Sequence, residues 1–209
     1  MAIDDSTSEP LPSLKDVTPA QWAALGQRRI FFGHQSVGGN IMDGIADVMA
    51  SNPEIRLRVV ESREVKAGAA PAFTHALVGR NDFPLEKFDD FVSIASNGFG
   101  PDGGIAMVKL CYTDAHKQTD PNALFADYQK RIADLKAKNP ALTVVHFTMP
   151  LTGIENWKGR LMSGLRGYTT QRERNVVRNR YNELMRKAYQ GREPFFDVAR
   201  LESTLPDGR

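Results

Sequence analysis

The chain has 209 residues, of which 41% are hydrophobic and 25% charged, a composition typical of one ordinary globular domain. The net charge of +2 gives no global attraction for nucleic acid, and no apolar run approaches the roughly 18 residues of a membrane span. A single cysteine excludes an internal disulfide framework and a cysteine-rich zinc site.

The first residues form a polar segment without the apolar core of a signal peptide. We expect a flexible leader over 1–17 and a single domain over 18–209. The protein is expected to be exported or periplasmic if a signal peptide has been removed, and cytoplasmic otherwise.

Apolar periodicity after the leader predicts alternating helices and strands. Apolar residues at helical spacing, with Pro and Asn at the ends, predict helices at 18–22, 41–49, 84–95, 121–135 and about 170–190. Compact apolar runs predict strands at 29–32, 55–60, 105–110, 142–147 and 195–198. A loop is expected from Gly68 to Gly79. This order predicts an α/β fold, a three-layer sandwich of the flavodoxin-like type with a five-stranded parallel sheet.

The turn after the first expected strand contains a serine at a chemically useful place. Gly33-His34-Gln35-Ser36 precedes a helix, so Ser36 is expected at the carboxyl edge of the sheet, where open α/β sheets bind ligands. Free N–H groups at the helix start could hold an oxyanion beside a serine nucleophile. An N-cap role for Ser36 explains the same pattern equally well.

The motif order resembles the SGNH (GDSL-like) hydrolase family over about residues 28–200. Phe-Phe-Gly-His-Gln-Ser at 31–36 stands where that family has an apolar strand and Gly-Asp-Ser, as in an uncharacterised branch with Gly-His-Gln-Ser. Gly-Arg-Asn-Asp at 79–82 resembles the second block of the family, and Cys-Tyr-Thr-Asp at 111–114 occupies the place of the third. The resemblance implies that the N–H groups of Ser36 and Gly79, with Asn81 or Thr113, support the oxyanion.

Two positions depart from that family's pattern. Thr113 stands where the third block has Asn, and the late Asp-x-x-His that brings the general base occurs nowhere in the chain. The domain is therefore expected to stop short of its C-terminal catalytic block. A serine without a base is a poor nucleophile, so a fluorophosphonate probe is expected to label the chain weakly or not at all.

The four histidines have different expected roles. His34 is the candidate base inside the turn, although a structural or substrate-orienting role is favoured. His116, like Gln35, is a candidate for substrate contact. His146 is expected to be a hydrogen-bonded core residue, and His75 a surface loop residue. Their spacing predicts no metal site, and no cofactor is expected.

Three further residues follow strands at the same edge. Asp197 could orient a base or a sugar, or could equally cap a loop, and Asp114 has the same two readings. Both are retained as candidates for substrate binding. Cys111 is expected to be buried and inert, because no cationic partner is evident in the sequence.

The favoured function is hydrolysis or acyl transfer of a small-molecule ester or a carbohydrate ester, with an acetylated carbohydrate as one candidate. The alternatives are non-catalytic modules on the same fold, one binding carbohydrate and one binding an anion. The anion would bind at the start of the helix after Ser36 and on the segment 155–200. That segment holds eleven Lys or Arg and five acids, for which a solvated helix face is the simpler explanation.

Overall fold

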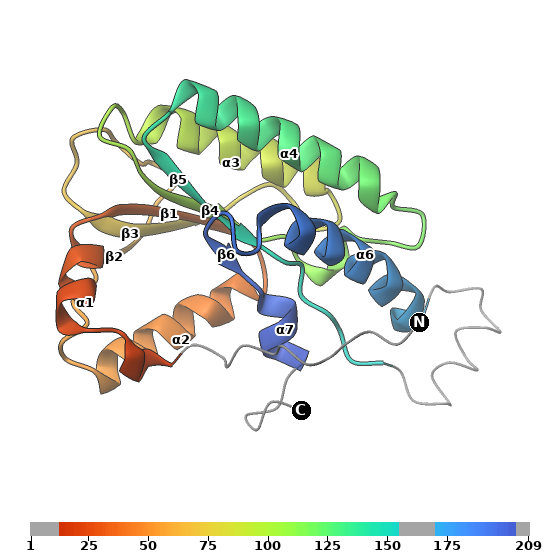
Figure 1. Ribbon diagram of the computed structural model, residues 1–209, viewed down its shortest axis with the longest axis horizontal. Helices are drawn as coiled ribbons and strands as arrows, with labels where there is room; N and C mark the ends of the chain where they lie inside the picture. The colour runs from red at the N-terminus through yellow and green to blue at the C-terminus, as the bar shows by residue number, and fades with distance from the viewer. Residues whose placement is uncertain (1–12, 155–169, 204–209) are drawn as a thin grey trace.

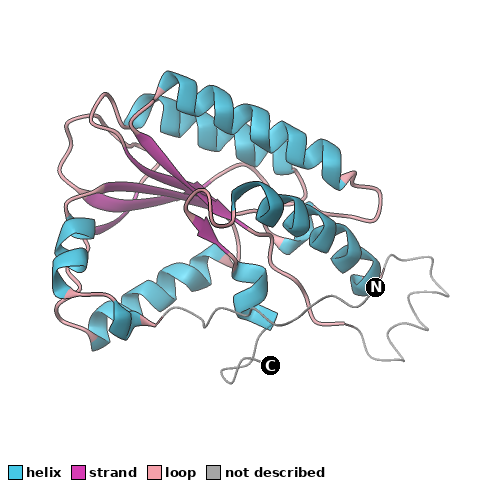
Figure 2. Ribbon diagram, viewed as in Figure 1, coloured by secondary structure: helices cyan, strands magenta, loops and turns pink. Residues whose placement is uncertain are grey.

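One parallel sheet lies between two layers of helices in the computed structural model, which describes residues 13–154 and 170–203 (Figures 1 and 2). The strand order is β2-β3-β1-β4-β5-β6. The α/β class and the parallel sheet are confirmed, and the expected number of five strands is wrong, because the sheet has six. The strands are β1 (Arg29–His34), β2 (Val59–Glu61), β3 (Ala72–Leu77), β4 (Gly104–Val108), β5 (Leu142–Phe147) and β6 (Phe195–Phe196).

The additional strand is β3, which lies inside the segment expected to be a loop. It pairs along its whole length with β1, from Arg29↔Ala72 to His34↔Leu77, and on its other side with β2. Thr74 and His75 interrupt the apolar pattern that the sequence prediction relied on. Strand formation here depends on two paired neighbours, because β propensity is set largely by context.

The helices form one layer on each face of the sheet. Figure 1 shows α3 and α4 on one side and α2 on the other. The α-helices are α1 (Pro19–Gly26), α2 (Gly38–Ser51), α3 (Pro84–Gly98), α4 (Pro121–Lys138), α6 (Gln171–Tyr189) and α7 (Val198–Ser203). Short 3-10 turns occur at η1 (Leu14–Asp16) and η2 (Tyr112–Asp114).

Alternation along the strands divides the core into two clusters. Phe31 points to the larger cluster, which contains side chains of α3, α4 and α6. Ile30 and Phe32 point to the smaller cluster, which contains Met42 of α2. Each such large apolar side chain stabilises the fold by about 1.5–3 kcal/mol when it is fully buried. The sheet is therefore fixed from both faces, and its carboxyl edge is held rigidly.

The two ends of the described chain differ from expectation. Ser13 caps η1, so residues 13–17 have defined local structure although they were expected in the leader. The last expected strand stops at Phe196, and α7 begins at Val198. Residues 1–12 of the expected leader and the chain end at 204–209 lie outside the described residues. No helix in the described ranges is long and apolar enough to cross a membrane.

Candidate active site at the carboxyl edge of the sheet

The topology reverses direction between β1 and β4. The chain leaves β1 toward β2 and β3 on one side, whereas it leaves β4 toward β5 and β6 on the other. The two strands pair directly, from Ile30↔Ile105 to Gly33↔Val108. Ligands of open parallel sheets bind beyond the carboxyl ends of such a strand pair. The segments to compare are therefore those that follow His34 and Val108.

Ser36 lies in the turn between β1 and α2 with a left-handed backbone. Its φ angle is 46°, and its side chain is exposed. A non-glycine residue in a rarely populated backbone conformation costs about 1–3 kcal/mol, and such strain concentrates at functional sites. The hydroxyl forms no hydrogen bond with a described residue. The N-cap of α2 is Val37, without a side-chain cap, so the N-cap reading of Ser36 is wrong.

Gly38 allows α2 to begin close to the end of β1. A Cβ atom on Gly38 would lie 2.3 Å from the Cβ of His34, closer than real atoms approach. The N–H groups of Gly38 and Gly39 already donate to the carbonyls of Gln35 and Ser36. Within the described part of the chain, the N–H groups of Ser36 and Val37 have no acceptor. Two free N–H donors in the same turn as an exposed serine are groups that can stabilise an oxyanion.

Gln35 joins this turn to the segment after β3. Its Nε2 donates to the carbonyl oxygen of Gly79 over 2.8 Å and lies 3.4 Å from that of Val78. The amide nitrogen is thus used internally. This bond fixes the position of the Ser36 turn, and the expected contact between Gln35 and substrate stays a prediction for its side-chain oxygen.

The second expected oxyanion residue, Gly79, does not present a free N–H group. That group donates to Oδ2 of Asp90 over 2.8 Å. Gly79 has a φ angle of 54°, and an added Cβ would lie 2.5 Å from the backbone nitrogen of Lys87. The glycine is needed for this close approach to α3. The expected oxyanion contact from Gly79 is therefore corrected, because its donor is already engaged by a carboxylate.

Asn81 and Thr113 keep donor groups that could serve an oxyanion. Oδ1 of Asn81 accepts a hydrogen bond from Lys87 over 2.9 Å, and its amide nitrogen has no partner among residues 13–154 and 170–203. The Thr113 hydroxyl is buried and has no partner in those ranges either. Both residues follow strands at the carboxyl edge. Both side chains thus keep an unused donor, the Thr113 hydroxyl in a buried position, whereas the Gly79 N–H is engaged.

Asp114 is a buried structural carboxylate. It is 1% exposed, and its Oδ2 lies 2.6 Å from Nζ of Lys87. The same carboxylate accepts the N–H groups of Cys111, at 2.6 Å, and Asp82, at 3.0 Å. With these contacts it connects the loop after β4 to the loop after β3. The expected substrate contact is therefore wrong for Asp114, because solvent does not reach it.

Asp197 is also held by protein groups. Both of its oxygens accept from the guanidinium of Arg186, at 2.7 and 2.9 Å. It further accepts the Thr148 hydroxyl at 2.9 Å and the N–H of Arg200 at 3.1 Å. The largest influence on its pKa, burial, raises it, but the hydrogen bond from Arg186 and the other contacts leave the pKa below its ordinary value. Of its two readings, the structural one fits these contacts.

His34 is paired with a second histidine. Its Nε2 lies 3.1 Å from Nδ1 of His75, which belongs to β3. The expected surface loop position of His75 is therefore wrong. Nδ1 of His34 is buried without a partner in the described ranges, and burial together with the charges of His75 and Lys109 lowers the pKa of His34 to about 4. A neutral, weakly basic imidazole of this kind is poorly suited to take a proton from serine.

The other two histidines lie in different surroundings. His116 is partly exposed, and its Nε2 lies 3.3 Å from Oδ1 of Asp82. His146 is fully buried, with Nδ1 2.7 Å from the Tyr128 hydroxyl and Nε2 3.1 Å from Oε2 of Glu193. The prediction of a hydrogen-bonded core residue is confirmed for His146. Neither ring is hydrogen-bonded to the hydroxyl of Ser36.

Lys109 and Cys111 occupy the β4 side of the crevice, and sequence reasoning missed the lysine. Both side chains are fully buried, as expected for Cys111. The lysine Nζ lies 3.9 Å from the thiol sulfur, so Cys111 does have a cationic neighbour. The thiol in turn donates to the carbonyl of Gln35 over 3.1 Å. The alternation of side chains along 105–110 could have indicated this, because it places residue 109 on the same face of the sheet as residues 105 and 107.

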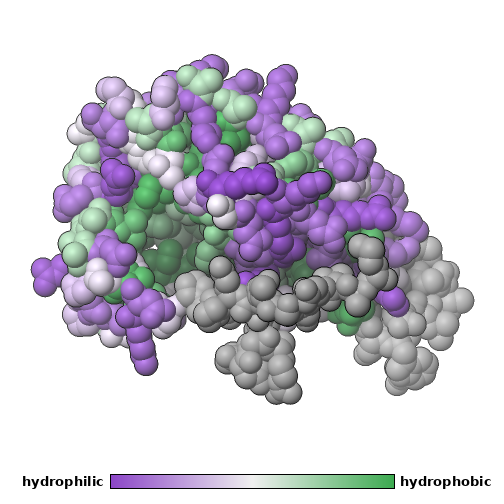
Figure 3. Space-filling view, in the orientation of Figure 1, coloured by the Kyte–Doolittle hydropathy of each residue, from purple (hydrophilic) through white to green (hydrophobic). Residues whose placement is uncertain are grey.

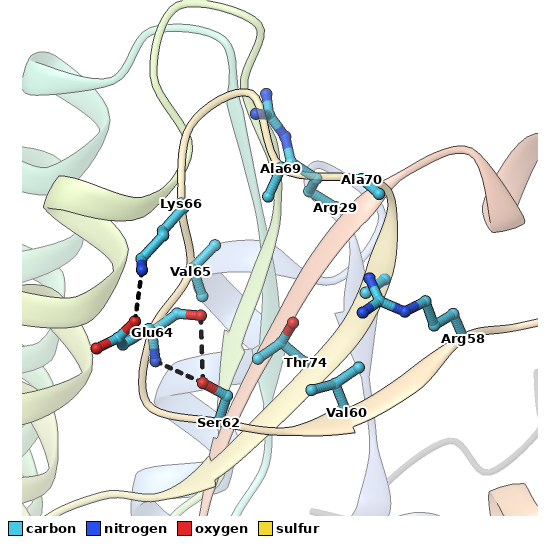
Figure 4. A pocket seen from close by; sticks show the side chains of 11 residues that line it. Arg29, Arg58, Val60, Ser62, Glu64, Val65, Lys66, Ala69, Ala70 and Thr74 are labelled. Carbon is cyan, nitrogen blue, oxygen red and sulfur yellow. Dashed lines mark hydrogen bonds and ion pairs between the residues drawn. The ribbon is translucent and has the colours of Figure 1, made fainter.

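The cavities lie at opposite edges of the sheet. The cavity in Figure 4 is lined by Arg29 and Arg58 at the amino ends of strands and by the exposed Glu64–Lys66 ion pair, so it lies away from Ser36. A second cavity of about 500 Å3 lies between the loop after β5, α6 and α7, and Asn175, Asn179 and Glu202 are among its lining residues. Of these two cavities, the second lies on the carboxyl side of the sheet.

The surface over α6 is strongly hydrophilic. Figure 3 shows these side chains gathered beside a hollowed apolar area of the same face. Arg172, Arg180 and Lys187 are exposed, whereas Arg178 is fully buried and donates to the carbonyl of Tyr112 over 2.8 Å. Burial lowers the pKa of Arg178 to about 10. The helix therefore combines a solvated face with arginines held by protein groups, namely Arg178 and Arg186.

The sequence matches no model of a known protein family, and no characterised protein is significantly similar to it. Among the described residues, no cluster of three or more His, Cys, Asp or Glu side chains is placed so that it could hold a metal ion. The case for function therefore depends on the geometry of the Ser36 turn.

Proposed function

We propose that the protein is a serine hydrolase or acyltransferase of the SGNH type, acting on esters, with Ser36 as its nucleophile. The observation that carries this proposal is the left-handed Ser36, exposed between β1 and α2 at the point where the strand order reverses. A serine held in a strained strand-to-helix turn presents its hydroxyl above the sheet edge beside free N–H groups. The resemblance in motif order supports the same chemistry.

The chemical steps follow from the groups in the crevice. The Ser36 hydroxyl gives its proton to a base as its oxygen attacks the acyl carbon, and the oxygen of the tetrahedral intermediate accepts hydrogen bonds from the N–H groups of Ser36 and Val37. Asn81 and Thr113 are additional donors. Collapse of the intermediate expels the alcohol, which takes up a proton, and leaves an acyl-serine. Water or another acceptor alcohol then removes the acyl group from Ser36.

The cavity beside α6 and α7 supports a polar substrate. Its lining combines the amides Asn175 and Asn179 and the carboxylate Glu202 with the apolar Ile154 and Val176. Sugars are bound by such mixtures of hydrogen-bonding groups and apolar contacts, since a site needs a few placed polar groups for orientation. An acetylated carbohydrate is therefore the substrate class that we favour.

The proposal is tested by turnover of p-nitrophenyl acetate and of an acetylated sugar. Replacing Ser36 by Ala should lower the rate by a factor on the order of 10⁶, as expected when a nucleophile is removed from its catalytic unit. Ser93→Ala, on the exposed face of α3, is the matched control and should keep full activity. Equal rates for wild type and Ser36→Ala would refute the proposal.

A non-catalytic carbohydrate-binding module is the second candidate. It is favoured by one observation, namely that no described base is hydrogen-bonded to the Ser36 hydroxyl. In that case acetylated sugars should bind without being consumed, and binding should survive Ser36→Ala. Calorimetric titration alongside the turnover assay separates the two functions.

A further inference from the structure

Lys109 follows the last residue of β4 and projects to the α2 side of the sheet. Ile105 and Met107 pack in the cluster on that side, whereas Ala106 and Val108 belong to the opposite cluster. The alternation of side chains along a strand therefore directs Lys109 toward α2. Its side chain is fully buried at the carboxyl edge.

The contacts of Lys109 connect it to both sides of the Ser36 turn. Its backbone N–H donates to the carbonyl of Gly33 over 3.0 Å, and its Nζ lies 3.3 Å from the carbonyl of Leu110. Nζ is also 3.9 Å from the Cys111 sulfur, which donates to the carbonyl of Gln35. Cys111 thus contacts both the amine of Lys109 and the residue that precedes Ser36.

No described carboxylate forms an ion pair with Lys109. The groups that face it are Cys111 and Asp114 after β4, Lys87 of α3, Glu202 of α7 and His34 of β1. Burial lowers the pKa of Lys109, and the charge of Lys87 acts in the same direction. Cys111, Glu202 and Asp114 oppose this shift. A buried, unpaired lysine tends to release its proton, because a desolvated ammonium without a partner is costly.

We infer that Lys109 is the general base that takes the proton of the Ser36 hydroxyl. This inference rests on the proposed serine chemistry. Serine–lysine pairs perform acyl transfer on unrelated folds, and a lysine serves as a base once burial has made it neutral. The proposal requires the Ser36 hydroxyl to approach Nζ when substrate is bound, and catalytic hydrogen bonds often tighten only in the reacting complex.

The proton transfers balance over the two half-reactions. In acylation, Nζ takes the hydroxyl proton while the oxygen forms its bond to the acyl carbon, and the resulting ammonium protonates the departing alcohol. In deacylation, the neutral amine takes a proton from water, whose oxygen attacks the acyl-serine. The ammonium then returns its proton to the Ser36 oxygen. No redox or metal partner is needed.

His116 is the competing base. It is partly exposed and paired with Asp82, whereas His34 is held by His75 and is too weakly basic. The two candidates predict different pH profiles. If Lys109 is the base, the rate of Ser36 acylation rises toward alkaline pH. This rise should remain in His116→Gln and disappear when Lys109 is replaced.

The test measures Ser36 acylation by p-nitrophenyl acetate as a function of pH in the full chain. Lys109→Met and Lys109→Gln should each lower the rate by about 10²–10⁴-fold, the usual contribution of a general base. Lys138→Met, an exposed lysine at the end of α4, is the matched control. Circular dichroism and urea unfolding establish that each variant is folded. If neither Lys109 variant folds, the pH profile of His116→Gln decides.

The outcomes separate this inference from the proposed function. Acylation that depends on Ser36, is lost in the Lys109 variants and keeps its alkaline limb in His116→Gln supports Lys109. Acylation that depends on Ser36 and is unchanged in the Lys109 variants overturns Lys109 and leaves the hydrolase proposal standing. Loss of the limb in His116→Gln assigns the base to His116. Absence of any acylation that depends on Ser36 refutes the hydrolase proposal itself.

Discussion

The two buried lysines at the carboxyl edge differ in their partners. Lys87 has Asp114 at 2.6 Å and Asn81 at 2.9 Å, so its charge is matched inside the protein. Lys109 has a carbonyl oxygen and a thiol as its nearest partners. Both side chains are fully buried. The comparison teaches that burial alone does not define a role: the paired Lys87 connects two loops, whereas the absence of an ion pair at Lys109 is what supports our proposal of proton transfer there.

The largest expected effect on stability comes from removing the charge of Lys87. Lys87→Met leaves the Asp114 carboxylate buried without its cation, which should lower the free energy of unfolding by about 3–5 kcal/mol. The double variant Lys87→Met/Asp114→Asn removes both charges and keeps an acceptor for the N–H of Cys111. It should recover part of that loss. Urea unfolding measures both, and a single variant as stable as wild type would contradict a structural role for the pair.

A substitution at Gly38 tests the Ser36 turn near Lys109, because it should displace the turn without altering either lysine. Gly38→Ala places a Cβ 2.3 Å from that of His34. Overpacking of this kind should cost about 1–3 kcal/mol and should impair acylation of Ser36. Gly39→Ala is the matched control, since nothing lies within 4 Å of its added Cβ. Equal loss in both variants would show that the contact with His34 is not the cause.

The smallest expected effect is the pH dependence of stability due to Lys109. Its pKa in the native protein lies below the ordinary value of 10.5. Between these two values the unfolded chain binds a proton that the native protein has released, so the free energy of unfolding rises with pH in that window. Urea unfolding should show this rise in wild type and Lys138→Met and lack it in Lys109→Met. Superimposable profiles for all three would mean that Lys109 is not shifted.

Part of the fold and site follows from sequence patterns alone. Compact apolar runs predict β1, β4 and β5, and the Gly-flanked turn predicts Ser36 between a strand and a helix. β3 could not be predicted in this way, because its pairing with β1 and β2 overrides a mixed pattern. Motif position also could not reveal that the Gly79 N–H is engaged by Asp90, since the bond joins two elements. Strand alternation could have placed Lys109 on an inward face of the sheet. Only the packed structure shows that no described carboxylate forms an ion pair with it.

The most direct test of Ser36 as an activated nucleophile is covalent labelling of the full chain by a fluorophosphonate, with the adduct located by peptide mass spectrometry. The sequence alone predicted weak labelling, because it offers no late histidine, whereas the base that we propose, Lys109 with its lowered pKa, changes that expectation. We predict one stoichiometric adduct on Ser36, formed faster as pH rises and absent from Ser36→Ala. A chain that stays unmodified at Ser36 throughout the alkaline range, or that is modified only elsewhere, would contradict the assignment.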